Sequence, residues 1–414
     1  MRVPIESVVG NHSMYRARGK KYDTGQRVPF RVSPTPLVLS RQQKNELVAT
    51  GKDITSYFQE IDELYQTNTI IRNILNIGKP DIFITKGASR YLFIRPDIII
   101  SKNGFTVCEI ETSLFGLALA EVLNRAYLNE GFGTLVERSA LLESVKKQTP
   151  TEGTIIYTDK TASYAGQMAF LAEQIFSGTG RNWQAQPINK YTPNIGVVYR
   201  GFYLEECASD SALRACLAAK NCVVPSATPH MEEKAILAFI WDRRFETLLK
   251  TRLGLGAFHH LRDIIPPTWI VGQEKYFTLG LPNGAATSTD IASLSRSKRT
   301  FVLKNSGYHC DSSWSEGVNF LHTKSADGAK RLLLQASQDC SSLYILQEFR
   351  KGKNIPMCYE HAEVTVPMSA RVRLTPYFSL SPGSEGELLA CKATGCENTD
   401  FIHASSVSIN TAVS

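Results

Sequence analysis

The chain has 414 residues, of which 43% are hydrophobic and 21% charged. This composition supports a large core divided into two or three domains and excludes a disordered chain. No apolar run reaches the roughly 18 to 20 residues of a membrane span, and the N-terminus lacks a signal-peptide apolar region. We therefore expect a cytoplasmic protein with no membrane partner. The nine cysteines are scattered and odd in number, which favours reduced thiols over a disulfide framework or a zinc site.

The formal net charge of +7 is concentrated at one end of the chain. Residues 1–31 contain seven basic and two acidic side chains, so this arm alone supplies +5. It could bind an anionic partner, fold back over a phosphate site, or form a solvated terminus. No aromatic platform accompanies its arginines, so we do not expect nucleic acid as a partner.

Helical patterns follow the arm. One is predicted from about residue 40 to 50. A second begins after Gly51, with Asp53 as a candidate N-cap and an apolar face formed by Ile54, Phe58, Ile61 and Tyr65. A third covers about 69–76. Residues 1–80 are therefore expected to form the basic arm and a helical region.

A β-hairpin is predicted between 96–100 and 105–111, because Asn103-Gly104 is a strong turn signal between two β-rich runs. Glu109 and Glu111 alternate along the second strand and so share one face. Like charges on one face repel unless a cation or an amine lies between them. The alternative is that one carboxylate points into solvent at the end of the strand.

Residues from about 150 to 228 are predicted to form an open parallel sheet. Apolar strands at 153–159 and 194–199 flank a helix at 163–176, and a third strand is expected at 222–224. The loop 158–161 follows a strand at its carboxyl end, where such sheets bind ligands. No glycine-rich dinucleotide fingerprint accompanies it.

A long amphipathic helix is predicted from about 232 to 253, followed by a stiff connector at Pro266-Pro267. Lys250 and Arg252 lie at the end of this helix. Either could bind a phosphate, or could simply stabilise the negative end of the helix dipole.

The most informative stretch runs from Phe301 to Phe349. An apolar strand ends in Lys304 and a Ser306-Gly307 turn, a helix follows, and a second apolar strand ends in Gln347-Glu348-Phe349. A lysine and a glycine-containing turn can bind phosphate oxygens, while the glutamate can accept from an exocyclic amine. This arrangement predicts a nucleotide-binding lid. The alternative is that the lysine and the glutamate are solvated strand ends.

These residues resemble the ATP-grasp superfamily. The resemblance rests on Lys304-Asn-Ser306-Gly307, Trp314-Ser-Glu-Gly317-Val318 and Gln347-Glu348-Phe349. It implies an α/β fold with an α+β lid, in which a Rossmann-like domain precedes a two-subdomain ATP-grasp fold. The expected division is 1–80, then a substrate domain at 81–228, then the ATP-grasp domain at 229–414 with its lid at about 270–350.

The resemblance also implies roles for individual residues. The expected ATP-binding residues are Lys250, Lys304, Ser306, Gly307, Gln347, Glu348 and Phe349. Arg95, Asp97, Glu109 and Glu111 are expected to have a substrate-binding or structural role. Arg371 and Arg373 alternate on one strand and are the candidate catalytic cations for a γ-phosphate or a substrate carboxylate. An exposed basic edge is the alternative for these arginines.

The metal site is where the sequence departs from the family. The resemblance implies Mg²⁺ held by an acidic residue on one strand and an acidic-x-Asn pair on the next, because Mg²⁺ prefers charged oxygen ligands. The pair here is Ser408-Ile-Asn410, and Glu387 is the nearest acidic candidate on the preceding strand. The expected metal ligands are therefore Glu387 and Asn410.

Together these features predict an ATP-dependent carboxylate–amine ligase acting through an acyl phosphate, with ATP and Mg²⁺ as cofactors. Its partners would be a small-molecule acid and amine, and a homodimer is compatible with the sequence. Ser408 favours an alternative, a nucleotide-binding regulatory module or pseudoenzyme without turnover. A phosphotransferase on the same fold also remains open.

Overall fold

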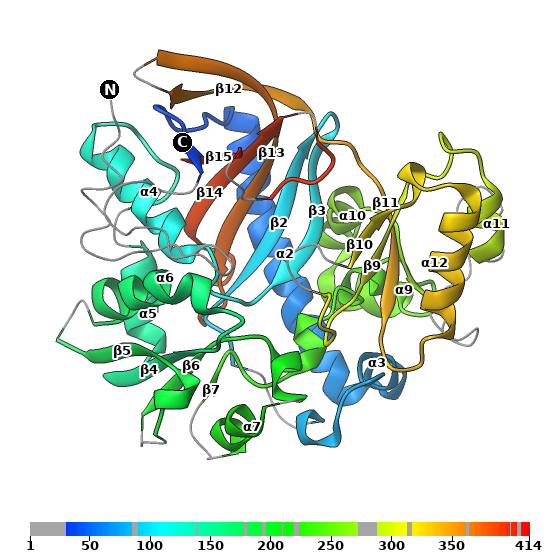
Figure 1. Ribbon diagram of the computed structural model, residues 1–414, viewed down its shortest axis with the longest axis horizontal. Helices are drawn as coiled ribbons and strands as arrows, with labels where there is room; N and C mark the ends of the chain where they lie inside the picture. The colour runs from blue at the N-terminus through cyan, green and yellow to red at the C-terminus, as the bar shows by residue number, and fades with distance from the viewer. Residues whose placement is uncertain are drawn as a thin grey trace.

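The computed structural model places the chain in three sheets with surrounding helices (Figure 1). It describes residues 30–84, 90–137, 140–177, 180–192, 196–208, 210–218, 223–271, 288–312, 317–361, 364–397, 399–403 and 407–414. Most of the basic arm, Trp314 and part of the predicted lid lie outside these residues. No helix within them is both long and apolar enough to cross a membrane.

The main sheet has the strand order β1-β15-β14-β13-β2-β3, with β12 paired to β13. Its strands are β1 (Arg31–Val32), β2 (Phe93–Ser101), β3 (Gly104–Glu111), β12 (Asn354–His361), β13 (Val364–Ser379), β14 (Leu388–Glu397) and β15 (Ile409–Ala412). The predicted hairpin at Asn103-Gly104 is confirmed as β2–β3. The hairpin pairs with β13, so the main sheet contains strands that precede residue 228 in the sequence and strands that follow it.

One face of the main sheet is apolar and packs against helices. These are α2 (Arg41–Thr67), α3 (Thr69–Leu75), α8 (Ile236–Phe239), α9 (Glu246–Leu253) and α10 (Leu255–Ile264). Figure 1 shows α2 running along this sheet. The predicted break at Gly51 is wrong, because α2 continues through it. A Cβ on Gly51 would lie 2.5 Å from the ring of Phe378, so the glycine permits close helix–sheet packing. Asp53 pairs with His260 instead of capping a helix.

The single helix predicted over 232–253 is also wrong, since α8 and α9 are separated by a turn. Asp242 is buried in that turn, where its carboxylate accepts a hydrogen bond from the backbone N–H of Arg244 at 2.9 Å. Such local side-chain bonds compete with helix hydrogen bonds.

The predicted parallel sheet is confirmed, with the strand order β5-β4-β6-β7. Its elements are β4 (Glu152–Tyr157), β5 (Asn182–Pro187), β6 (Val197–Gly201), β7 (Val223–Val224), α5 (Ala140–Gln148), α6 (Ala165–Phe170) and α7 (Ser211–Ala218). The helix α4 (Leu117–Asn129) contacts β14 and shares a core with this sheet, which joins it to the main sheet.

The third sheet is antiparallel, with the order β10-β9-β11-β8, and we call it the lid sheet. Its elements are β8 (Thr268–Val271), β9 (Phe301–Asn305), β10 (Val318–Phe320), β11 (Tyr344–Glu348), α11 (Ser288–Ser293) and α12 (Ala326–Gln338). The strands predicted around Lys304 and Gln347 are therefore confirmed, and they are direct neighbours.

Candidate functional site

The second face of the main sheet carries charged side chains. We call the part formed by Arg95, Asp97, Glu109, Glu111, Arg373 and Lys392 the polar face. Arg95 lies opposite Glu111, and Asp97 lies opposite Glu109, in the β2–β3 pair. Arg95 forms an ion pair with Glu111. Arg373 of β13 donates to Asp97 at 2.8 Å. The structure thus brings Arg373, a predicted catalytic residue, to the four residues that were predicted as one substrate-binding or structural group.

Charges on this face shift one another's ionisation. Burial opposes the charged form of Asp97, but the guanidinium groups of Arg373 and Arg95 outweigh it and lower the pKa of this carboxyl. Burial raises the pKa of Glu111 despite its pairing with Arg95. Shifted carboxyls close together are typical of binding and catalytic sites.

Lys304 reaches the polar face from the lid sheet. Its Nζ donates to the backbone carbonyl of Cys108 in β3 at 3.0 Å and to Oε1 of Gln347 at 2.8 Å. Gln347 in turn donates to the hydroxyl of Thr268 at 3.1 Å. Burial lowers the pKa of Lys304. The predicted pair Lys304 and Gln347 therefore lies between the lid sheet and the main sheet.

The Ser306-Gly307 turn lies against the segment that precedes α8. The hydroxyl of Ser306 accepts from the backbone N–H of Ala235 at 2.7 Å. A Cβ on Gly307 would lie 2.6 Å from the carbonyl oxygen of Glu232. Only glycine fits this close approach. The loop that follows β9, residues 306–312, therefore lies at the edge of a pocket, and we call it the lid loop.

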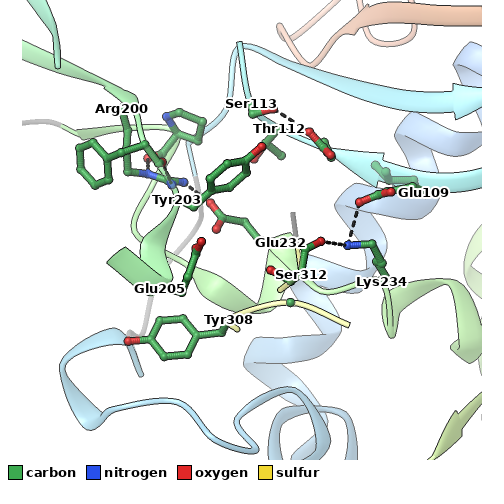
Figure 2. Close-up of a pocket in the computed structure, with 15 residues that line it drawn as sticks. Glu109, Thr112, Ser113, Arg200, Tyr203, Glu205, Glu232, Lys234, Tyr308 and Ser312 are labelled. Atoms are coloured by element: carbon green, nitrogen blue, oxygen red, sulfur yellow. Dashed lines mark hydrogen bonds and ion pairs between the residues drawn. The ribbon is translucent and has the colours of Figure 1, made fainter. Parts of the chain in front are cut away.

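This pocket lies between the hairpin, the parallel sheet and the lid loop, and its cavity volume is about 40 Å³. Of the predicted residues, Glu109, Glu111 and Gly307 line it. Sequence reasoning missed other lining residues, which include Arg200, Tyr203, Glu205, Glu232 and Lys234. Figure 2 shows Arg200 at one end of the pocket and the Glu109–Lys234 pair at the other.

Each acidic side chain of the pocket has a basic partner on another element or segment. The ion pairs are Lys234–Glu109 at 2.8 Å, Arg95–Glu111, Lys160–Glu205 at 3.0 Å and Arg200–Glu232. Burial opposes the charged form of Lys234, but Glu109 outweighs it and raises the pKa of this ammonium. Alternating charges of this kind suit a ligand that carries both an acidic and a basic group.

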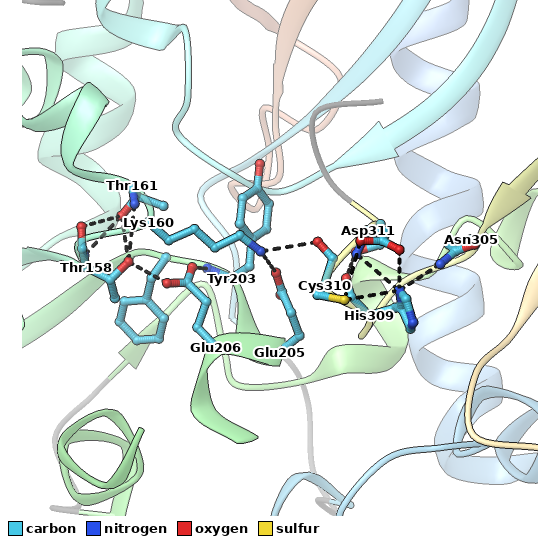
Figure 3. Close-up of polar contacts among 12 residues, drawn as sticks. Thr158, Lys160, Thr161, Tyr203, Glu205, Glu206, Asn305, His309, Cys310 and Asp311 are labelled. Carbon is cyan, nitrogen blue, oxygen red and sulfur yellow. Dashed lines mark hydrogen bonds and ion pairs between the residues drawn. The ribbon is translucent and has the colours of Figure 1, made fainter. Parts of the chain in front are cut away.

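Two lysines connect the lid loop to the rest of the pocket. Lys160 binds Glu205 and also donates to the carbonyl of Cys310 at 3.3 Å (Figure 3). Lys234 donates to the carbonyl of Ser312 at 2.8 Å. Burial raises the pKa of Glu205 to about 7. The sequence signal was present, because Glu205 follows a parallel strand at its carboxyl end.

The other predicted residues lie away from this pocket. Arg371 pairs with Asp400, not with Asp97. Phe349 stacks on His322, with ring centroids 5.1 Å apart. Glu348 has 37% of its side chain exposed and lies 4.0 Å from Nε of Arg350.

Lys250 also takes local partners. It forms an ion pair of 2.6 Å with Glu246 on its own helix and lies over the ring of Phe258. These contacts match the helix-end alternative, and Lys250 is not among the residues that line the pocket.

The structure does not bring together the two predicted metal ligands. Asn410 lies opposite Thr394 on β14 and accepts from its hydroxyl at 2.9 Å. Glu387 is exposed and precedes β14, so it lies roughly 20 Å along the strand from Thr394. Lys392 donates to Thr394 at 2.9 Å. A buried lysine beside neutral oxygens does not fit Mg²⁺, which needs anionic ligands.

Within the described part of the chain, His309, Cys310 and Asp311 form the one group of metal-binding side chains close enough to share an ion. They are consecutive residues of the lid loop, and Cys310 and Asp311 are exposed. The Nδ1 atom of His309 already accepts from the backbone N–H of Asp311 at 3.1 Å and lies 2.8 Å from Nδ2 of Asn305. This geometry fits a turn held by hydrogen bonds.

No protein-family model and no curated protein matches the chain. Among solved structures, it is similar to a glutathione synthetase-like effector from Globodera pallida in its apo form. That match has a TM-score of 0.56 and 11% identity, and covers 99% of this chain and 94% of the other. A candidate gamma-glutamylcysteine synthetase from Methylobacillus flagellatus KT matches with a TM-score of 0.45 and 12% identity, over 90% and 87% of the chains.

The first match establishes a shared fold along nearly the whole chain. The predicted α/β class is confirmed by the three sheets and their helices, and the fold is shared with the glutathione synthetase-like effector. The finer division into a Rossmann-like domain and an ATP-grasp domain stays a prediction, as do the roles of the individual residues.

Proposed function

We propose that this protein is an ATP-dependent ligase that joins a small carboxylic acid to an amine through an acyl phosphate. One observation carries the proposal: Lys304 of the lid sheet reaches the hairpin that also presents Glu109 and Glu111 to the pocket. A cation between two sheets, beside a pocket of paired charges, suits phosphate groups next to a charged substrate. The glutathione synthetase-like fold supports the same reading.

In this proposal the chain's residues have separate tasks. Lys304 binds phosphate oxygens, and Arg373 stabilises charge that develops on the transferring group. The ion pairs of Glu109 and Glu232 orient the acid and the amine in the pocket. ATP supplies the phosphoryl group, and no step is assigned to a metal bound by Glu387 and Asn410.

The test is release of ADP by the full chain with ATP and Mg²⁺, across a panel of amino acids and small peptides. We expect release that needs an acid and an amine together, and a drop of at least 100-fold for Lys304→Met. Lys330→Met is the matched control, because Lys330 is exposed on α12 of the same lid. Turnover unaffected by Lys304→Met would contradict the assigned role.

A second candidate is a nucleotide-binding module without ligase turnover. The observation that favours it is the absence of a carboxylate around Asn410 among the described residues of β14 and β15, where Lys392 and Thr394 lie instead. Binding of ATP without ADP release, for every acid and amine offered, would replace the first proposal with this one.

A further inference from the structure

Lys392 is a buried basic residue that the proposed mechanism does not use, and burial together with the nearby Arg373 lowers its pKa to about 7. Its residue exposure is 5%, and it lies on the same face of β14 as Thr394. Among the described residues its Nζ atom forms one hydrogen bond, to the hydroxyl of Thr394, and no ion pair. An ammonium has three donors, so its remaining N–H groups lack a protein acceptor here.

Neighbouring groups also offer more donors than acceptors. The Nε atoms of Arg95 and Arg373 are buried without a hydrogen-bond partner in the described part of the chain. The unpaired acceptors here include Oδ1 of Asp97 and the hydroxyl of Thr375, which lies opposite Lys392 in the β13–β14 pair. Buried polar groups normally find partners, so this surplus predicts a ligand rich in acceptors.

The balance of charges on the polar face also favours a ligand that is rich in hydrogen-bond acceptors. Arg95, Arg373, Lys392 and Lys304 all act electrostatically on Asp97. Asp97 and Glu111 pair with Arg373 and Arg95, and Glu109 acts on Lys304, so Lys392 is the cation of this group without a matching carboxylate among the described residues. A divalent cation would be repelled, whereas an oxyanion would satisfy both the charge and the free donors.

We propose that the polar face binds the phosphate groups of its ligand directly. Lys392 takes the place of the divalent cation that the resemblance to the ATP-grasp superfamily implies. This inference rests on the proposed function only in placing a phosphate-bearing ligand between the lid sheet and the main sheet. The ligand chemistry is a polyphosphate, either free or as the tail of a nucleotide.

Calorimetry on the full chain tests this inference, with ATP, inorganic tripolyphosphate and adenosine as probes. Each is titrated with EDTA and no metal, and again with MgCl₂. We expect ATP or tripolyphosphate to bind in EDTA with an affinity within threefold of that in Mg²⁺. Tighter binding of ATP than of tripolyphosphate assigns the site to a nucleotide tail, and the reverse assigns it to a free polyphosphate.

Lys392→Met keeps an unbranched side chain one atom shorter than that of lysine and removes its charge. We expect it to weaken tripolyphosphate binding at least tenfold, while Lys330→Met on the exposed side of α12 changes nothing. Unchanged affinity in folded Lys392→Met would overturn the inference. If that variant does not fold, the metal dependence of the unaltered chain still decides.

The two proposals fail differently. ATP that binds only with Mg²⁺ overturns the metal-free site and leaves the ligase proposal standing. If neither ATP nor tripolyphosphate binds with or without Mg²⁺, both proposals are wrong.

Discussion

The Nζ atom of Lys304 donates a hydrogen bond to the backbone carbonyl of Cys108 at 3.0 Å, although the two residues are 196 positions apart in the chain. This contact joins β9 of the lid sheet to β3 of the main sheet. It places the best sequence candidate for phosphate binding next to Glu109, a residue that lines the pocket. The relationship makes several parts of the site testable.

The first prediction concerns Lys304 and ATP affinity. Lys304→Met should weaken ATP binding by about 1.5 to 3 kcal/mol, because a charge-assisted hydrogen bond to phosphate is lost. Tripolyphosphate binding should weaken equally, since the lysine contacts phosphates and not the base. Calorimetry on both probes measures this, and a loss confined to ATP would contradict it.

The second prediction concerns the buried pair Arg373 and Asp97. Arg373→Gln should destabilise the fold by about 1 to 3 kcal/mol, because the Asp97 carboxylate loses its hydrogen-bonded guanidinium while Arg95 still lies near it. Adding Asp97→Asn should restore a large part of the loss. Urea unfolding of the two single variants and the double variant measures the coupling. Additive losses would show that the pair does not interact.

The third prediction is a pH dependence set by Glu205. Its pKa is raised by burial to about 7, so between about pH 4.5 and 7 the folded state binds more protons than the unfolded state. Stability contributed by this group is therefore present at low pH and lost as pH rises through about 7. Relative to Glu205→Gln, the unaltered chain should lose on the order of 3 kcal/mol over that range.

Denaturant unfolding at a series of pH values compares the two proteins. Glu385→Gln, on an exposed turn, controls for the loss of one negative charge. A difference between the unaltered chain and Glu205→Gln that stays constant with pH would contradict this prediction.

The fourth prediction concerns Glu348. Because 37% of its side chain is exposed, Glu348→Ala should change the free energy of unfolding by less than about 0.5 kcal/mol. If it accepts from a purine amine, ATP affinity should fall by about 1 to 3 kcal/mol and tripolyphosphate affinity should not change. Equal losses for both probes would argue against recognition of the base.

Local patterns in the sequence determined much of the fold. Alternation and the Asn103-Gly104 turn predicted the hairpin, and apolar runs predicted the parallel sheet and the strands that carry Lys304 and Gln347. These features depend on neighbouring residues, so a single sequence contains them. The hydrogen bond of Lys304 to Gln347, in contrast, depends on the pairing of β9 with β11 in the folded protein.

Only the tertiary structure decided which distant segments meet. Pairing of the hairpin with β13 brings Arg373 to Asp97, whereas Arg371 on the same strand meets Asp400. Gly51 looks like a helix break in the sequence but is a point of close packing in the fold.

Lys392 shows most clearly the difference between what the sequence determines and what the tertiary structure determines. In the sequence it is a single charge within an apolar run, which suggests burial but names no partner. Its place beside Thr394 and among Arg95, Arg373 and Asp97 comes from strand register across the main sheet. Register depends on hydrogen bonds and packing between strands that are far apart in the chain, and local propensity does not encode it.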